Sequence, residues 1–199
     1  MKKLLCVFLC VLLLLCGCTE QAAPDKKQET QKIPALPSLQ GYDLYAGFAR
    51  ADVTPMLGIG MAGYYVNRNA DGVLDPLQIN ALALACGEDK VVLMSIDHCG
   101  IVKSVLNPMR QHICDVTGLP WEAVYIHATH THTAPFLNPN PTDPLENEYA
   151  QTVTRKLADA AKMALDDLKP AKMGYGIGHA PNIAFVRRFR MKDGKVRTN

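Results

Sequence analysis

The apolar residues of this chain fall into short runs after residue 43, separated by Gly, Pro and Asp. Runs of strand length occupy residues 43–55, 77–86, 91–97 and 123–129, and the turn-like sequence GEDK joins the second run to the third as in a hairpin. Residues 101–118 have helical spacing, which is interrupted or restarted at Asn107 and Pro108 and ends at Gly118. The pattern therefore predicts a strand, helix and strand in succession across residues 91–129.

This order predicts a crossover between parallel strands, which brings Asp97 and the following histidine cluster to the same edge of a sheet. Open α/β sheets bind their ligands at that edge. A second, longer helix is predicted between Pro144 and Pro170. Its apolar face consists of Tyr149, Val153, Leu157, Ala160, Ala161, Ala164, Leu165 and Leu168.

The last thirty residues predict more strands. Residues 171–180 are a strand candidate, and residues 185–199 are a hairpin candidate around Asp193 and Gly194. Its second strand reaches the last residue, so we expect the fold to be incomplete at the C-terminus. The predicted fold class is α/β, a mixed β-sheet with packed helices that contains one strand-helix-strand crossover.

The first 42 residues have a different character. A basic start and a short apolar stretch over residues 1–17 predict a secretory signal peptide. The sequence LLCGC resembles a bacterial lipobox, so we expect Cys18 to be acylated as the first mature residue; a plain signal peptide or an uncleaved anchor is the alternative. Residues 18–42 are polar and predict a flexible tether, and residues 43–199 form the folded domain. The predicted location is a bacterial cell envelope, on a membrane and facing outside the cytoplasm.

Charge, cysteine content and one glycine pattern argue against three classes of protein: nucleic-acid-binding, disulfide-rich and dinucleotide-binding. The formal net charge is +2 without a basic cluster of useful length, so we expect no nucleic-acid partner. Beyond Cys18, the cysteines Cys86, Cys99 and Cys114 are scattered and predict buried thiols rather than a disulfide framework, although one pair could bond. The G-x-G-x-x-G pattern of residues 58–63 lacks the helix that a dinucleotide site requires, which favours a loop.

The sequence YIHATHTHTAPF, residues 125–136, contains the main candidate site. If the segment is extended, His130 and His132 point the same way, as two ligands of one zinc ion would. We expect Thr129, Thr131 and Thr133 to hydrogen-bond the outer ring nitrogens, and His127 to be packed or to support the site. The alternative is a pair of loop histidines without metal.

The same segment, read as THTHTAP at residues 129–135, resembles the T-H-T-H-S-G-P hallmark of the neutral ceramidase family. AGFARADVTP, GMAGYY, VVLMSIDHCG and RRFRMKDGKVRTN resemble further family segments in the same order, over about residues 45–199. Thr133 and Ala134 stand where the family has Ser-Gly, and Val186 stands where Asn is expected.

This resemblance implies a zinc-dependent hydrolase that cleaves the N-acyl amide bond of a ceramide-like lipid into a fatty acid and a sphingoid base. His130 carries over as a zinc ligand, and His132 as its active-site neighbour and proton carrier. Arg187 or Arg188 is expected to anchor a polar head group of the substrate.

The resemblance places the family's remaining zinc ligands, a histidine, a glutamate and a tyrosine, in later segments. We therefore expect residues 43–199 to be the N-terminal part of a catalytic domain and to be inactive alone. The alternative function is a surface lipoprotein that keeps the fold and binds a ligand or partner without turnover.

Overall fold

In the computed structural model, which describes residues 43–137, 142–184 and 186–198, five strands form one mixed sheet. β1 (Leu44–Asp52), β2 (Gln78–Cys86) and β3 (Asp89–Ile96) are antiparallel neighbours. β4 (Val124–Ala128) runs parallel to β3, and the short β5 (Lys169–Pro170) pairs with β1, giving the order β4-β3-β2-β1-β5. The α/β class, the β2–β3 hairpin and the parallel crossover are confirmed.

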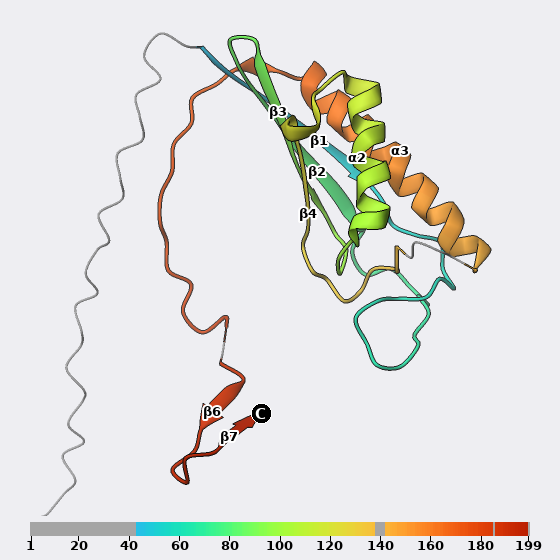
Figure 1. Cartoon of the computed structure of the whole chain (residues 1–199), viewed down its shortest axis with the longest axis vertical. Coiled ribbons are helices and arrows are strands. Elements are labelled where there is room, and N and C mark those ends of the chain that lie inside the picture. The colour runs from blue at the N-terminus through green and yellow to red at the C-terminus, as the bar shows by residue number, and fades with distance from the viewer. Residues whose placement is uncertain (1–42, 138–141, 185, 199) are drawn as a thin grey trace, which may run out of the picture. The chain divides into compact units, whose positions relative to one another are not determined.

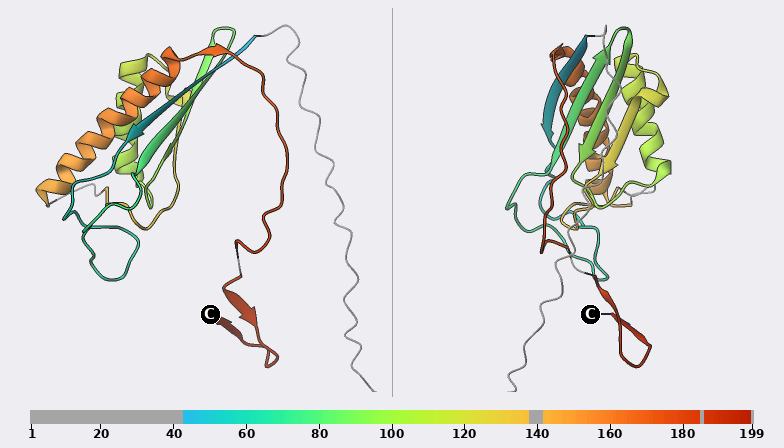
Figure 2. Two further views of the ribbon diagram at one scale, coloured as in Figure 1. Left: turned by 180° about the vertical axis from the view of Figure 1, so that it is seen from behind. Right: turned by 90° about the vertical axis from the view of Figure 1, so that its left-hand side faces the viewer.

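Two helices cover one face of this sheet (Figures 1 and 2). α2 (Lys103–Thr117) connects β3 to the 3-10 turn η1 (Trp121–Ala123) and β4. Gly118 caps the C-terminal end of α2: it has a left-handed φ of 73°, and its amide donates a hydrogen bond to the Cys114 carbonyl. The helix runs through Pro108 without the expected interruption. Proline removes one backbone bond near the N-terminal end, and the rest of the helix tolerates that loss.

α3 (Pro144–Asp166) is the long helix that the sequence predicts. Its N-cap residue Asp143 accepts a hydrogen bond from the amide of Leu145 at 2.8 Å, and Pro144 occupies the first turn, where its missing N–H costs nothing. The predicted apolar face is confirmed. Tyr149, Val153, Leu157, Ala160, Ala161 and Ala164 are buried, whereas Leu165 and Leu168 are partly buried against the same core.

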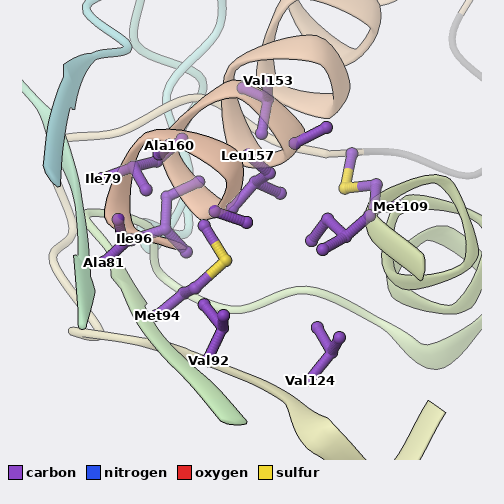
Figure 3. Close-up of a cluster of buried hydrophobic side chains, with 14 of the residues drawn as sticks. Ile79, Ala81, Val92, Met94, Ile96, Met109, Val124, Val153, Leu157 and Ala160 are labelled. Carbon is purple, nitrogen blue, oxygen red and sulfur yellow. The ribbon is translucent and has the colours of Figure 1, made fainter. Parts of the chain in front are cut away.

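The core lies between the helices and the covered face of the sheet (Figure 3). Alternate residues of the strands point into it, as the two-residue period of a strand requires. Val92 and Met94 from β3 meet Leu157 from α3 and Met109 from α2. Small residues on β2, such as Ala81 and Ala83, let the helix approach the sheet closely.

The opposite face of the sheet is not covered by a described helix. In the strand register, Phe48, Leu82, Leu93 and Tyr125 stand in one row across β1 to β4. Phe48 is 66% exposed and Tyr125 is 57% exposed. The next row toward the C-terminal end of β3 is polar, with Arg50, Asn80, Ser95 and His127.

Residues after β5 differ from the prediction. Residues 171–180 form no strand; only Ala171 extends the pairing, because its amide donates a hydrogen bond to the Leu44 carbonyl at 2.8 Å. The antiparallel register would pair later residues with positions before Leu44, where β1 has not begun. Beyond this segment, β6 (Arg188–Arg190) and β7 (Val196–Thr198) form the predicted hairpin.

The G-x-G-x-x-G stretch is a loop, as predicted. Bridges pair Gly60 with Asn69 and Met61 with Pro135, and the Ala62 amide donates to the Ala134 carbonyl at 2.8 Å. The loop therefore contacts the segment that follows β4.

The three described cysteines, Cys86, Cys99 and Cys114, are free; Cys114 is buried and the other two are partly buried. The expected thiol state is therefore confirmed for all three, and the expected burial fully only for Cys114. No helix in the described part of the chain has both the length and the apolar character needed to span a membrane. The predicted signal peptide, the tether and the acylation of Cys18 lie outside the described residues.

One fully buried polar side chain ties the sheet to α3. His98, the second residue after β3, has 0% exposure, and its Nε2 lies 3.1 Å from the Tyr149 hydroxyl. Tyr149 donates its only hydroxyl hydrogen to the Val53 carbonyl at 2.9 Å, so Nε2 of His98 must be the donor in the first bond. The other ring nitrogen of His98, Nδ1, is buried without a hydrogen-bond partner.

Burial lowers the pKa of His98 to about 4, opposed in part by the charge of Asp97. Burial also raises the pKa of Tyr149, with smaller contributions from Asp52 and Asp97. Because an unfolded histidine titrates near 6.5, the unfolded chain binds this proton first as the pH falls. The folded state is therefore fully stable with respect to this group above pH ~6.5 and loses stability toward pH ~4.

We predict that His98→Gln flattens the pH dependence of stability between pH ~6.5 and ~4. Glutamine can still donate to Tyr149 but does not titrate, and the wild-type loss from this group over that interval is roughly 3 kcal/mol. Urea unfolding at several pH values measures the difference. The exposed-histidine variant His127→Gln should keep the wild-type slope, and equal slopes for His98→Gln and wild type would contradict the prediction.

Candidate metal centre

The histidine loop, residues 129–135, begins where β4 ends and continues its parallel pairing with the chain after β3. The Thr129 amide donates to the Ile96 carbonyl at 3.0 Å, and the His130 amide donates to the His98 carbonyl at 2.8 Å. His130 itself has a φ of 66°, so the chain turns there instead of staying extended. These two bonds place His130 beside Cys99, the residue after the buried His98.

The rings of His130 and His132 face each other. Their Nε2 atoms are 3.2 Å apart, and their ring centroids are 4.9 Å apart. His130 Nδ1 lies 2.6 Å from the Cys99 carbonyl oxygen, which can only accept, so Nδ1 carries the hydrogen. The lone pair of His130 is therefore on Nε2, the atom that faces His132. The predicted convergence of the two imidazoles is observed, although a turn produces it rather than strand alternation.

Cys99 is the third member of this cluster. The donor atoms of Cys99, His130 and His132 all lie within 4.8 Å of one another, and the cysteine is partly buried while both histidines are exposed. Sequence reasoning assigned Cys99 only as a buried thiol. The signal that could have found it was its position three residues after β3, the strand that pairs in parallel with the strand preceding the histidines.

The geometry fits a zinc ion. Two nitrogens bound to one tetrahedral zinc at about 2.0–2.1 Å lie roughly 3.3 Å apart, close to the observed 3.2 Å between the Nε2 atoms. The bond from Nδ1 of His130 to a carbonyl is the usual arrangement that orients a zinc-binding imidazole. Imidazole nitrogen and thiolate sulfur are the donors that zinc prefers.

A separate loop, residues 63–68, contacts His132. The Tyr64 ring meets the His132 ring edge-on, with centroids 6.0 Å apart, and the Arg68 guanidinium lies 3.4 Å from the centroid of Tyr64. Arg68 also donates to the His132 carbonyl at 3.3 Å. Gly63 lies against the imidazole: a Cβ atom there would be 2.4 Å from its Cγ. This contact explains why the loop has glycine at position 63.

Two expectations about neighbouring side chains are wrong. The threonine hydroxyls do not bond the ring nitrogens: Thr131 and Thr133 bond each other at 2.8 Å, and Thr129 donates to Asp97 at 3.1 Å. The Cys99 carbonyl takes that role for His130 because the parallel pairing brings it closer. His127 is neither packed nor close to the cluster, because its strand position points to the uncovered face, beside Tyr125.

A cavity of about 760 Å³ lies between the histidine loop and residues 54–77. Its volume falls in the range of small-molecule sites. Most of the wall is apolar, and its polar side chains are one arginine, three aspartates and three threonines. The wall consists of Thr54, Pro55, Leu57, Met61, Arg68, Ala70, Asp71, Gly72, Val73, Leu74, Asp75, Pro76, Leu77, Asp97, Thr131, Thr133 and Pro135.

The arginines predicted to hold a head group are in the hairpin. Arg188 begins β6, where it pairs with Thr198, and Arg187 precedes it; both are exposed. Among the described residues, no hydrogen bond or ion pair joins either arginine to the histidine loop. Their role stays a prediction.

Comparison with solved structures shows that the fold of this chain is a known one. No protein-family model and no curated protein sequence matches the chain. The neutral ceramidase from Pseudomonas aeruginosa matches with a TM-score of 0.57 and 18% identity, over 64% of this chain and 22% of that chain. The chain has a ceramidase-like fold. A ceramidase complexed with C2 matches with a TM-score of 0.55 and 19% identity, over the same shares of the two chains.

The ceramidase likeness concerns the fold, because identity is below one fifth in both comparisons. The chain spans about a fifth of the length of the ceramidases that it matches. The fold expected from the ordered sequence segments is therefore confirmed, and the chemistry rests on the residues of the site.

We predict that Gly63→Ala weakens zinc binding by roughly 10- to 100-fold, the range for residues that orient metal ligands. The new methyl group would displace the His132 ring. Gly58→Ala is the matched control, because its φ of +91° resembles the +92° of Gly63 but its Cβ would have nothing within 4 Å. Competition with a chromophoric chelator measures both affinities. Equal weakening in the two variants would show that backbone strain, not contact with His132, is responsible.

Proposed function

We propose that this chain belongs to a zinc-dependent hydrolase that cleaves the N-acyl amide bond of a ceramide-like lipid, releasing a fatty acid and a sphingoid base. The observation that carries the proposal is the pair of facing Nε2 atoms, 3.2 Å apart, in a ceramidase-like fold. Hydrolysis adds water across the C–N bond, with the hydroxyl on the acyl carbon and the hydrogen on the amine nitrogen.

His130 and His132 hold the zinc ion in this proposal. Zinc supplies Lewis acidity, which makes an amide carbonyl more electrophilic and water more acidic. The chain's own contribution is orientation. The Cys99 carbonyl holds the His130 ring in the required tautomer, and Gly63, Tyr64 and Arg68 hold His132.

His132 has two candidate roles, zinc ligand and proton carrier, and one nitrogen cannot serve both at once. Its Nε2 points at the lone pair of His130 Nε2, which supports ligation. If His132 is a ligand, His132→Ala loses zinc; if it is only a proton carrier, the variant keeps zinc and loses rate by roughly 10²-fold or more.

The cavity beside the histidine loop supports an apolar substrate. Leu57, Met61, Val73 and Leu77 offer an apolar wall to a hydrocarbon chain. Thr131 and Thr133 belong to both the cavity wall and the loop that carries the metal-binding histidines. A lipid chain in this cavity would therefore lie next to the proposed zinc site. Arg187 or Arg188 is proposed to bind a polar head group.

We predict that the natural gene product carrying this chain hydrolyses ceramide and simpler N-acyl amines, and that chelation or His130→Ala abolishes this activity. Removing one ligand from a catalytic zinc site removes the ion and the barrier reduction that depends on it. Assays with and without chelator, together with zinc content and circular dichroism, measure the effect. His127→Ala is the control, since His127 lies outside the cluster.

Activity that survives chelation would contradict the hydrolase. A product that binds zinc and lipid without turnover would support the alternative, a surface lipoprotein that binds a ligand or partner. That alternative is retained because the chain corresponds to only 22% of the matching ceramidase.

The proposed location is the outside of a bacterial membrane, through an acyl group on Cys18 in the lipobox-like LLCGC. Such an anchor would place the protein where lipid amides occur. We predict that Cys18→Ala leaves the protein unprocessed or soluble. Membrane fractionation and lipid labelling of wild type and variant test the anchor, with Cys86→Ala as the control. Unchanged processing and membrane recovery in Cys18→Ala would rule it out.

A further inference from the structure

Cys99 contributes more to the metal centre than its carbonyl group. We infer that the Cys99 thiolate is a third protein ligand of the metal, so that this chain holds zinc through one sulfur and two nitrogens. The inference rests on the metal site of the proposed function, and it assigns a ligand that neither the ceramidase resemblance nor the spacing of the histidines supplies.

The first argument is proximity. The Sγ atom of Cys99 and one ring nitrogen from each of His130 and His132 lie within 4.8 Å of one another. Cys99 lies 31 residues before His130 and 33 residues before His132 in the sequence. A zinc ion binds sulfur at about 2.3 Å and imidazole nitrogen at about 2.0–2.1 Å, so one ion can reach three donors spaced in this way after small side-chain rotations.

The second argument is that the same residue already orients His130. The backbone carbonyl of Cys99 accepts the Nδ1 hydrogen of His130 at 2.6 Å, and the neighbouring His98 carbonyl accepts the His130 amide at 2.8 Å. The backbone of Cys99 is therefore held at His130 by two bonds, and a short side chain from that backbone cannot move far from the His130 ring. On this argument the thiol is preorganised rather than a mobile surface group.

The third argument is coordination number. A catalytic zinc site needs three protein ligands and one open position for water or substrate. Among the described residues, His130 and His132 alone are one ligand short of this number, and Cys99 supplies a third donor whether or not later segments add more. Binding converts the thiol to a thiolate, and its proton is released to solvent. A sulfur donor also shifts the preference of the site toward softer metals such as Cd²⁺.

The test uses the whole 199-residue chain loaded with Co²⁺, which reports its ligands in the absorption spectrum. A thiolate ligand produces a sulfur-to-cobalt charge-transfer band in the near ultraviolet, which nitrogen and oxygen ligands do not produce. We expect this band in the wild type and its loss in Cys99→Ser. Zinc affinity of Cys99→Ser should fall by roughly 100-fold or more, since even residues that only orient ligands contribute 10- to 100-fold.

Cys86→Ser is the matched control. Cys86 is also free and partly buried, but it ends β2 beside Asp89, about 27 Å along the strand from the end that carries the cluster. This variant should keep the band and the affinity. In Cys99→Ser, the affinity for Cd²⁺ relative to Zn²⁺ should fall below that of the wild type, because the sulfur donor is gone. Circular dichroism checks that the variants fold.

The outcomes separate this inference from the proposed function. Absence of the band in the wild type, or its persistence in Cys99→Ser, overturns the role of Cys99 and leaves the zinc hydrolase standing. A band that depends on Cys99, together with a natural gene product that hydrolyses no amide, supports the ligand and rejects the hydrolase. If Cys99→Ser binds no cobalt at all, the wild-type band, retained in Cys86→Ser, decides in favour of the ligand.

Discussion

The parallel pairing of β3 with β4, continued beyond both strand ends, is the interaction on which the site depends. The Thr129 amide bonds the Ile96 carbonyl, and the His130 amide bonds the His98 carbonyl, so the two chain segments stay together for two more residues. Because parallel strands finish at the same edge, both segments deliver their next side chains to one place. Cys99 and His130 meet for this reason, although α2 and η1 separate them in sequence.

Support from the core keeps that edge in place. His98 is buried between the two segments and α3, and its bond to Tyr149 continues to the Val53 carbonyl at the end of β1. The segment after β3, α3 and the segment after β1 are therefore joined through His98, the residue next to Cys99. Protonation of the buried His98 costs free energy, so these contacts are most stable while His98 is neutral.

His132 depends on a different part of the chain. Its position is set by residues 63–68, through the Gly63 approach, the Tyr64 edge contact and the Arg68 bond to its carbonyl. The fold is ceramidase-like over 64% of the chain. Within that fold, Cys99, His130 and His132 form a group that could hold a metal ion, and the proposed amide hydrolysis rests on this group together with the ceramidase-like fold.

The periodicity of apolar residues was enough to predict most of the strands and helices of the domain. The alternating residues of β2 and β3, the apolar face of α3 and the glycine that ends α2 were readable because each depends on neighbours within a few positions. The ordered motifs also indicated the fold and the pair His130 and His132. Residues 171–180 were misread as a strand, since a strand needs a partner and their register runs past the start of β1.

The site needed the tertiary structure. No sequence spacing connects Gly63 or Tyr64 to the histidines, because they lie 66 or more residues away from His130. Cys99 is connected to them only through the parallel pairing of the two strands. The turn at His130, with its φ of 66°, replaced the extended geometry assumed from the alternating pattern. Local sequence determines which residues form strands and helices, whereas the donors of a metal centre are decided by which backbones pair, and that is settled only when the sheet and its loops are assembled.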